Sequence, residues 1–201
     1  MDSRQRDILT ALQRGGDMAD HVETLRFLVF NHVFGDILEL GVRTGVSTLA
    51  ILLALQEDSD GDSVCRLTSL DREPCLAARQ AVERAGLGGR WTFLQRDALN
   101  WTDMPQNKFW DMIFVDLDHG REETERVLEV YAPRVKCGGW MVFHDTISHP
   151  ELWAALEVWR GTEGLAWNMY HWRHCAGLAA FHNFDCRAPE RCWYEEAEVE
   201  K

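Results

Sequence analysis

The sequence lacks the features that nucleic-acid binding, membrane insertion and secretion require. Its 33 acidic residues outnumber its 21 Lys and Arg residues, and the resulting net charge of -12 argues against the basic face that a nucleic acid needs. No apolar run approaches the roughly 20 residues that cross a membrane. The charged N-terminus also lacks the apolar stretch of a signal peptide. We therefore expect a cytoplasmic protein that binds neither nucleic acid nor membrane.

The six cysteines form neither a paired metal-binding motif nor a dense disulfide framework. They are spread from Cys65 to Cys192, and no C-x-x-C pair occurs. A chain of this size does not need disulfides for stability, so we expect reduced thiols. The His- and Cys-containing stretch 171–192 leaves a structural zinc site open as a less favoured alternative.

The pattern of apolar residues predicts an α/β domain with a mostly parallel sheet and helices on both faces. Hydrophobic residues make up 46% of the chain and charged residues 27%, which is ordinary for a globular protein. The expected strands are residues 36–40, 64–71, 91–98, 110–118, 137–146, 165–173 and 176–183, the last two forming a hairpin. The expected helices are residues 3–13, 18–30, 46–56, 73–86, 121–135 and 150–160.

We expect residues 1–201 to form a single domain with three parts. Residues 1–32 form an N-terminal helical segment that could close over the site as a lid. Residues 33–184 carry the core sheet. Residues 185–201 form an acidic tail that we expect to be solvated.

Unusual polar residues stand at the ends of five successive expected strands. Ligands of open α/β sheets bind beyond the carboxyl ends of the strands, where these side chains would gather. Any one acid could instead cap a helix, but five in succession favour a binding site. These residues are Glu39, Asp71, Asp97, Asp116 with Asp118, and His144 with Asp145.

The stretch DILELGVRTGVSTLAIL, residues 36–52, holds the first of these strand ends. Gly41 and Gly45 allow a tight turn and a close approach of a ligand to the main chain. The following helix would direct free N–H groups at the same place, and Ser47 adds a hydroxyl, which suits a carboxylate or phosphate. The loop does not read G-x-G-x-x-G, so a nicotinamide-dependent oxidoreductase is disfavoured.

The position of Glu39, two residues before Gly41, resembles motif I of the class I S-adenosylmethionine-dependent methyltransferases. The resemblance implies that this loop, which also contains Arg43, holds the methionine part of the cofactor. It further implies that Asp71 accepts both ribose hydroxyls, since a carboxylate has two acceptor oxygens.

The same resemblance places Asp97 near the adenine amino group. Leu70, Arg72 and Ala98 would then form the walls of the adenine site. A second interpretation of Asp97, as the N-cap of a helix, remains open.

The stretch 111–146 resembles the methyltransferase-24 family, which includes sugar O-methyltransferases. The resemblance rests on a D-x-x-H at the fourth strand, Asp116 and His119, and on His144 and Asp145 at the fifth. It implies a Mg²⁺ or Mn²⁺ site formed by Asp116, His144 and Asp145, with Asp116 and His119 in the catalytic role and His119 as the base. The family often carries an aromatic residue after this histidine, where this chain has Gly120. Alternatively no metal binds, Asp116 orients His119, and Asp145 caps the next segment.

Together these features predict a Rossmann-like class I methyltransferase fold with seven strands and an antiparallel C-terminal hairpin. The expected activity is methyl transfer from S-adenosylmethionine to a hydroxyl of a small molecule, such as a sugar or secondary metabolite. The alternative is a module that binds S-adenosylmethionine or a nucleotide without transferring a methyl group. A homo-oligomer is compatible with the sequence.

Overall fold

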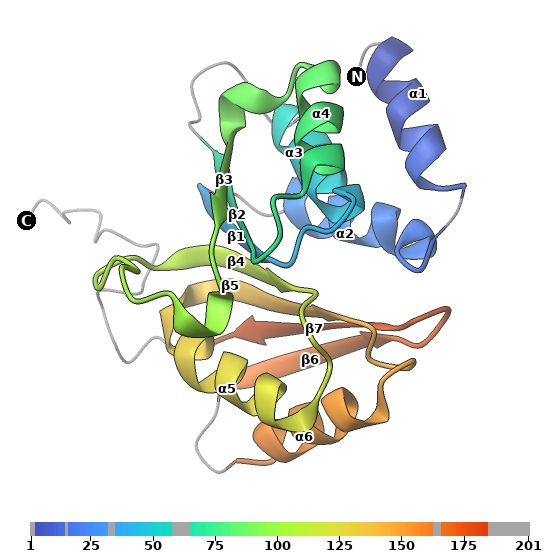
Figure 1. Ribbon diagram of the computed structural model, residues 1–201. Helices are drawn as coiled ribbons and strands as arrows, with labels where there is room; N and C mark the ends of the chain where they lie inside the picture. Colours follow the sequence, from blue (N-terminus) through green and yellow to red (C-terminus); the bar gives the residue numbers. More distant parts are fainter. Residues whose placement is uncertain (1–2, 15, 32–34, 58–64, 163–165, 185–201) are drawn as a thin grey trace, which may run out of the picture.

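The protein forms one seven-stranded sheet, in the order β3-β2-β1-β4-β5-β7-β6 (Figure 1). The computed structural model describes residues 3–14, 16–31, 35–57, 65–162 and 166–184. Strands β1 to β5 pair in parallel, and β7 runs antiparallel between β5 and β6. The strands are β1 (Asp36–Leu40), β2 (Arg66–Asp71), β3 (Trp91–Gln95), β4 (Trp110–Val115), β5 (Val135–His144), β6 (Trp167–Trp172) and β7 (Leu178–Asn183).

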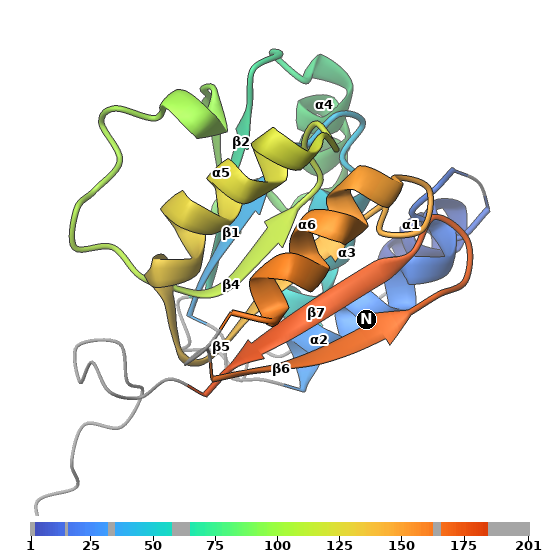
Figure 2. The same ribbon diagram turned by 90° about the horizontal axis from the view of Figure 1, so that it is seen from below.

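Helices cover both faces of this sheet and create two cores (Figures 1 and 2). The first face carries α1 (Ser3–Leu12), α2 (Val22–Phe30), α3 (Val46–Glu57) and α4 (Leu76–Ala85). The second face carries α5 (Arg121–Tyr131) and α6 (Pro150–Arg160). The predicted fold class, including the antiparallel C-terminal hairpin, is confirmed.

Helix α3 fixes the position of the loop that precedes it. All its residues from Ser47 to Leu55 are buried, because its apolar residues lie on every side of the helix. Helix α2 packs against it on one side and the sheet lies on the other. A helix held in this way gives the turn between β1 and α3 a rigid support.

Several predicted boundaries differ from the structure by a few residues, and proline explains one of them. The helix expected over 121–135 ends at Tyr131, because Pro133 has no N–H to continue it, and β5 begins at Val135. The helix expected over 73–86 begins only at Leu76. The strand expected over 91–98 ends at Gln95.

The N-terminal segment packs into the first core. Leu9 of α1 and Leu25 and Val29 of α2 are buried in the same cluster as Phe114 of β4. A lid role for residues 1–32 stays a prediction, and the tail 185–201 lies outside the described residues. Among the described residues, no helix is long and apolar enough to span a membrane.

The expectation of reduced thiols is wrong for one cysteine. Cys65, Cys75 and Cys175 are free, whereas Cys137 is disulfide-bonded. In the described part of the chain, no cysteine belongs to a group of three side chains that could share a metal ion. Part of the stretch 171–192 lies outside those residues, so the zinc alternative is not tested there.

A buried ion pair joins β4 to β5. The Asp111 side chain is fully buried, and its carboxylate lies 2.6 Å from Lys136 Nζ. The other carboxylate oxygen accepts hydrogen bonds from the main-chain N–H groups of Gly35 and Asp36, at 2.7 and 2.6 Å. Burial raises the pKa of Asp111, although these partners oppose the shift.

Replacing Lys136 with methionine should reduce the free energy of unfolding by about 3 kcal/mol at neutral pH, because a buried carboxylate loses its counter-charge. The difference in unfolding free energy between wild type and this variant should become smaller at acidic pH, because Asp111 then takes up a proton and no longer needs a counter-charge. Urea denaturation at several pH values measures both effects. Lys108→Met is the matched control, because Lys108 pairs with Asp36 where both side chains are 37% exposed. An equal loss of unfolding free energy in the two variants would contradict the stabilising role of the buried pair between Asp111 and Lys136.

Candidate active site

A cavity of about 350 Å³ opens at the carboxyl ends of the parallel strands, where the predicted site residues were expected. Its lining includes ten of them: Gly41, Arg43, Asp71, Arg72, Asp97, Ala98, Asp116, Asp118, His119 and Asp145. Glu39, Gly45, Ser47 and His144 lie behind this lining. The strands therefore bring most of the predicted residues together, in two layers.

Glu39 supports the first loop from below. Its side chain is fully buried and accepts hydrogen bonds from three hydroxyls, those of Ser47 at 2.7 Å, Thr48 at 2.8 Å and Ser69 at 2.5 Å. Burial raises the pKa of Glu39 to about 7, against the effect of the three hydroxyls. Glu39 and Ser47 thus bind each other, and Glu39 joins the start of α3 to β2.

The two glycines of the loop make room for protein rather than for a ligand. Gly41 has φ +91°, and a Cβ there would collide with the main-chain carbonyl of Asp116. Gly45 has φ +86°, and a Cβ there would lie 2.7 Å from Ala78 Cβ of α4. Only Gly41 also borders the cavity. The expected close approach of a ligand is therefore limited to Gly41.

Asp71 holds the loop from the end of β2. One carboxylate oxygen accepts the N–H groups of Val42 and Arg43, at 2.8 and 3.0 Å, and the other accepts that of Glu73 at 2.9 Å. Burial would raise the pKa of Asp71, but these main-chain donors outweigh burial and lower it. The Cys75 thiol also donates to this carboxylate. Because a carboxylate has about four acceptor positions, a ligand hydroxyl would have to replace this weak thiol donor.

Asp97 caps a short 3₁₀ helix, Ala98–Asn100, and also borders the cavity. Its side chain accepts the N–H of Leu99 at 3.0 Å, as the N-cap alternative proposed. The buried Tyr131 hydroxyl donates to the carbonyl of Ala98 at 2.6 Å. Helix α5 therefore fixes the wall of the cavity that Ala98 forms.

Two histidines and two aspartates form the charged centre of the site. His119 Nε2 lies 3.1 Å from a carboxylate oxygen of Asp145 and 3.5 Å from one of Asp116. His144 Nδ1 lies 3.5 and 3.4 Å from the same two oxygens. We call His119, His144, Asp116 and Asp145 the His-Asp centre. Asp116 and His119 follow β4, and His144 and Asp145 end β5, so the pairing of these strands creates it.

The charges in this centre stabilise one another. Burial would lower the pKa values of His119 and His144, but the two carboxylates raise them to about 9 and about 10. Burial would raise the pKa of Asp145, yet both imidazoles hold it well below its usual range. Without a metal ion, both histidines are therefore cationic and both aspartates anionic at neutral pH.

The donor set of this centre fits a divalent cation. Asp116, His144 and Asp145 each offer one ligand atom within 4.8 Å of the others. His119, Asp145 and His149 form a second such group. Two carboxylate oxygens and an imidazole suit manganese or another transition metal better than magnesium, which prefers oxygen ligands.

The sequence did not identify several residues that surround the centre. The His149 ring stacks on the His119 ring, with centroids 4.1 Å apart. His21 of the N-terminal segment is fully buried, and its ring lies edge-on to His144 at 5.7 Å. The missed lining residues are Arg96, Leu99, Asn100, Leu117 and Glu123. None of these five carried a sequence signal.

Known proteins are similar to this chain in sequence. A family model described as a methyltransferase domain matches residues 38–146, which include both the first loop and the His-Asp centre. The chain belongs to this family. The match confirms the resemblance to the methyltransferase-24 family seen in the sequence. A putative caffeoyl-CoA O-methyltransferase of Arabidopsis thaliana is 31% identical over 116 residues, which cover 55% of this chain and 46% of that protein. The chain thus spans about half the length of the curated relatives it matches.

Solved structures share the whole fold of this family member. A putative O-methyltransferase from Klebsiella pneumoniae superposes with a TM-score of 0.71 at 17% identity, covering 91% of this chain and 90% of that one. An O-methyltransferase from Bacillus cereus, solved in complex with SAH, gives 0.68 at 18% identity and covers 91% of both chains. At this identity the likeness establishes the fold alone.

Because of the ion pairs in the His-Asp centre, we expect the folded protein to lose stability at alkaline pH. The unfolded chain loses its histidine protons near pH 6.5, whereas the folded protein keeps them up to about pH 9–10. This stabilisation is complete below pH 6.5 and is lost as the pH rises through 9 and 10. Without divalent cations, Tm should fall by at least about 5 °C between pH 7 and pH 10.

Other groups also titrate between pH 7 and pH 10. The contribution of the His-Asp centre is therefore measured by comparing the pH dependence of Tm between wild type and variants. Asp145→Asn should show a smaller alkaline loss of Tm, since one of the two carboxylates has gone. Asp118→Asn is the control, because Asp118 is 64% exposed and pairs with Arg72 outside the centre. Identical pH profiles for wild type and Asp145→Asn would contradict the assigned charges.

Proposed function

We propose that this protein transfers the methyl group of S-adenosylmethionine to a hydroxyl of a small molecule, with help from a divalent cation and His119. The observation that carries the proposal is the His-Asp centre at the edge of the cavity bordered by Gly41, Asp71 and Asp97. With a divalent cation bound, the centre would bind a hydroxyl and take up its proton. The cavity offers polar groups for the cofactor beside it.

Several groups around the cavity suit S-adenosylmethionine. Asp71 borders the cavity and could accept a ribose hydroxyl in place of the weak Cys75 thiol donor, and Asp97 and Ala98 form the next stretch of wall. The loop at Gly41 leads into α3, whose N-terminus favours a carboxylate. When bound there, the cofactor supplies a methyl group already activated by a sulfonium. The SAH complex of the Bacillus cereus neighbour supports this assignment.

Asp116, His144 and Asp145 would hold the divalent cation. When bound, such a cation lowers the pKa of a coordinated hydroxyl and favours its oxyanion. The donor set itself supports this role, because a cation would replace the protons that now balance the two carboxylates.

His119 would take the proton of the acceptor hydroxyl. With its pKa near 9 in the cation-free protein, His119 is a proton donor at neutral pH rather than a base. A second positive charge beside it would lower this pKa and make the imidazole available as an acceptor. The base role and the cation therefore depend on each other.

The acceptor would enter from a second hollow beside the centre. This hollow, of about 550 Å³, shares Asp118 and His119 with the first cavity and is bounded on its other side by His149, Pro150 and Glu151. A molecule placed there has its hydroxyl next to His119. The name of the Arabidopsis relative supports oxygen as the methylated atom.

Replacing Asp71 with asparagine should weaken binding of S-adenosylhomocysteine at least tenfold, because a hydrogen bond to a charged acceptor contributes roughly 1.5–3 kcal/mol. Isothermal titration measures the change. Glu73→Gln is the control, since only the main chain of Glu73 binds Asp71. Unchanged affinity in a variant that folds normally would show that the ribose lies elsewhere.

Binding of Mn²⁺ should release between one and two protons at pH 7, because His144, and in part His119, must lose theirs. Titration in buffers with different ionisation enthalpies gives the number of protons without any acceptor. Asp145→Asn should bind at least tenfold more weakly, whereas Asp118→Asn should bind as wild type does. Binding without proton release would contradict the ligand role of His144.

His119→Gln should lose most turnover while retaining affinity for S-adenosylhomocysteine, because only proton removal is affected. The assay follows a labelled methyl group from S-adenosylmethionine into a panel of hydroxylated acceptors. EDTA should abolish transfer, and Mn²⁺ or Mg²⁺ should restore it. Tight cofactor binding with no transfer to any acceptor would favour the non-catalytic alternative, and full activity in EDTA would exclude the cation.

A further inference from the structure

Asp145 belongs to a second group of metal-ligating side chains, which the proposed function does not use as a unit. Its three members are His119, Asp145 and His149, and their ligand atoms all lie within 4.8 Å of one another. We call it the two-histidine group. It differs in chemistry from the group of Asp116, His144 and Asp145, because it offers two imidazoles and one carboxylate instead of one imidazole and two carboxylates.

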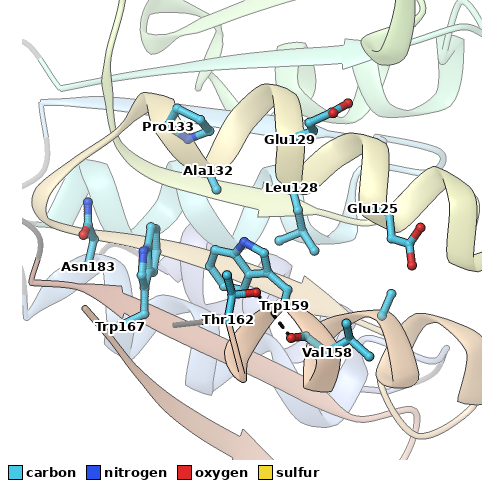
Figure 3. A pocket seen from close by; sticks show the side chains of 11 residues that line it. Glu125, Leu128, Glu129, Ala132, Pro133, Val158, Trp159, Thr162, Trp167 and Asn183 are labelled. Carbon is cyan, nitrogen blue, oxygen red and sulfur yellow. Dashed lines mark hydrogen bonds between the residues drawn. The ribbon is translucent and has the colours of Figure 1, made fainter. Parts of the chain in front are cut away.

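Acidic side chains elsewhere do not form a comparable group. The hollow between α5 and α6, of about 540 Å³, has Glu125 and Glu129 on its α5 side, but no histidine is among the described residues that line it (Figure 3). Both acids pair with arginines of their own helix, at 2.8 and 2.7 Å. In the part of the chain that the structure describes, the groups of three side chains that could share a metal ion are the two that contain Asp145.

The turn after β5 brings His149 to this place. The N–H of His149 donates to the carbonyl of Asp145 at 3.0 Å, which closes one turn of chain just before α6. The Ser148 hydroxyl donates to Oδ1 of Asp145 at 2.7 Å. The other carboxylate oxygen, Oδ2, lies 3.1 Å from His119 Nε2. The turn thus fixes the carboxylate and the His149 main chain relative to each other and directs a free oxygen at His119.

The two imidazole rings of the group lie side by side. Their centroids are 4.1 Å apart, and their planes differ by 18°. His119 follows β4 and His149 precedes α6, so two separate segments supply them. In tetrahedral zinc sites, bonds of about 2.0–2.1 Å place neighbouring ligand atoms about 3.4 Å apart. Small rotations of the side chains are therefore enough to close the group around one ion.

The two-histidine group faces the hollow of about 550 Å³ in which the acceptor would bind. His119 and His149 both line this hollow, and Asp145 borders the adjoining cavity. A metal ion held by the three side chains would keep a coordination position open to water. Two histidines, one carboxylate and one open position are an arrangement that zinc adopts in proteins.

We propose that the two-histidine group is an inhibitory zinc site. Zinc binds nitrogen and oxygen ligands more tightly than manganese does, and imidazole is a ligand that suits it. A neutral imidazole has one ring nitrogen free to accept either a proton or a metal ion, so zinc bound to His119 removes the base. Zinc also takes Asp145 from the neighbouring cation group. The inhibitory effect rests on the proposed function, whereas the zinc site does not.

The first test measures zinc binding without cofactor or acceptor, by titration against a competing chelator. The affinity for Zn²⁺ should fall at least tenfold in His149→Gln, whereas the affinity for Mn²⁺ should change less than twofold. Glu151→Gln is the matched control, because Glu151 lines the same hollow but belongs to neither donor group. Its zinc affinity should change less than twofold. An equal loss of zinc affinity in the two variants would overturn the proposal.

The second test needs no variant. X-ray absorption at the zinc edge counts the imidazole ligands of one equivalent of Zn²⁺ in the wild-type protein. Two imidazoles are expected, and one fewer in His149→Gln. A single imidazole in the wild-type protein would place zinc with Asp116, His144 and Asp145, and the proposal would be wrong.

The third test measures inhibition of Mn²⁺-dependent methyl transfer by Zn²⁺, relative to the zinc-free rate of each variant. The zinc concentration for half inhibition should rise at least tenfold in His149→Gln and less than twofold in Glu151→Gln. Equal inhibition of wild type and His149→Gln would refute the inhibitory role. If no acceptor is methylated at all, the proposed function fails, and the two binding tests still decide whether the zinc site exists.

Discussion

The packing of Gly41 against the main chain of Asp116 connects the two halves of the site. At this point the end of β1 touches the end of β4 so closely that no side chain fits between them. The N–H of Gly41 donates to Leu70 at 2.9 Å, and the N–H of Asp116 donates to Leu40 at 2.8 Å. The loop that would hold the cofactor and the carboxylate that would hold a cation are therefore fixed relative to each other by the sheet itself. Methyl transfer needs this precision, because the reacting atoms must lie in line at about 3–3.5 Å.

Much of this arrangement could be predicted from the sequence, because it depends on local patterns. Alternating strands and helices define the sheet, and parallel strands bring their carboxyl ends to one edge, which was enough to gather Asp71, Asp116 and Asp145. The inward orientation of Glu39 could not be predicted, because Ser69, one of its three hydroxyl partners, lies on another strand. The same is true of the pair between Asp111 and Lys136 and of the ring stacking of His149 on His119. These contacts depend on side-chain packing between distant segments, and a single sequence carries no signal for it.

The acidic residues of the chain lie in two different environments. At the His-Asp centre the side chains of Asp116 and Asp145 are only 22% and 10% exposed and are balanced by imidazoles, so their charges act mainly within the centre. On the surface of α5, acids pair with arginines of the same helix, and solvent weakens these pairs. The net charge of -12 therefore says little about the chemistry of the site. The chemistry of the site is decided by the local surroundings of Asp116 and Asp145.

Asp145 has φ +63°, in the left-handed region of the backbone. Among the twenty amino acids, glycine adopts this region freely, and asparagine and aspartate follow with a small cost. Glycine offers no ligand atom, and asparagine offers an oxygen without a charge. The backbone and the chemistry together thus leave aspartate as the one residue that satisfies both at this position. Natural variation and laboratory selection should both find position 145 nearly closed to change.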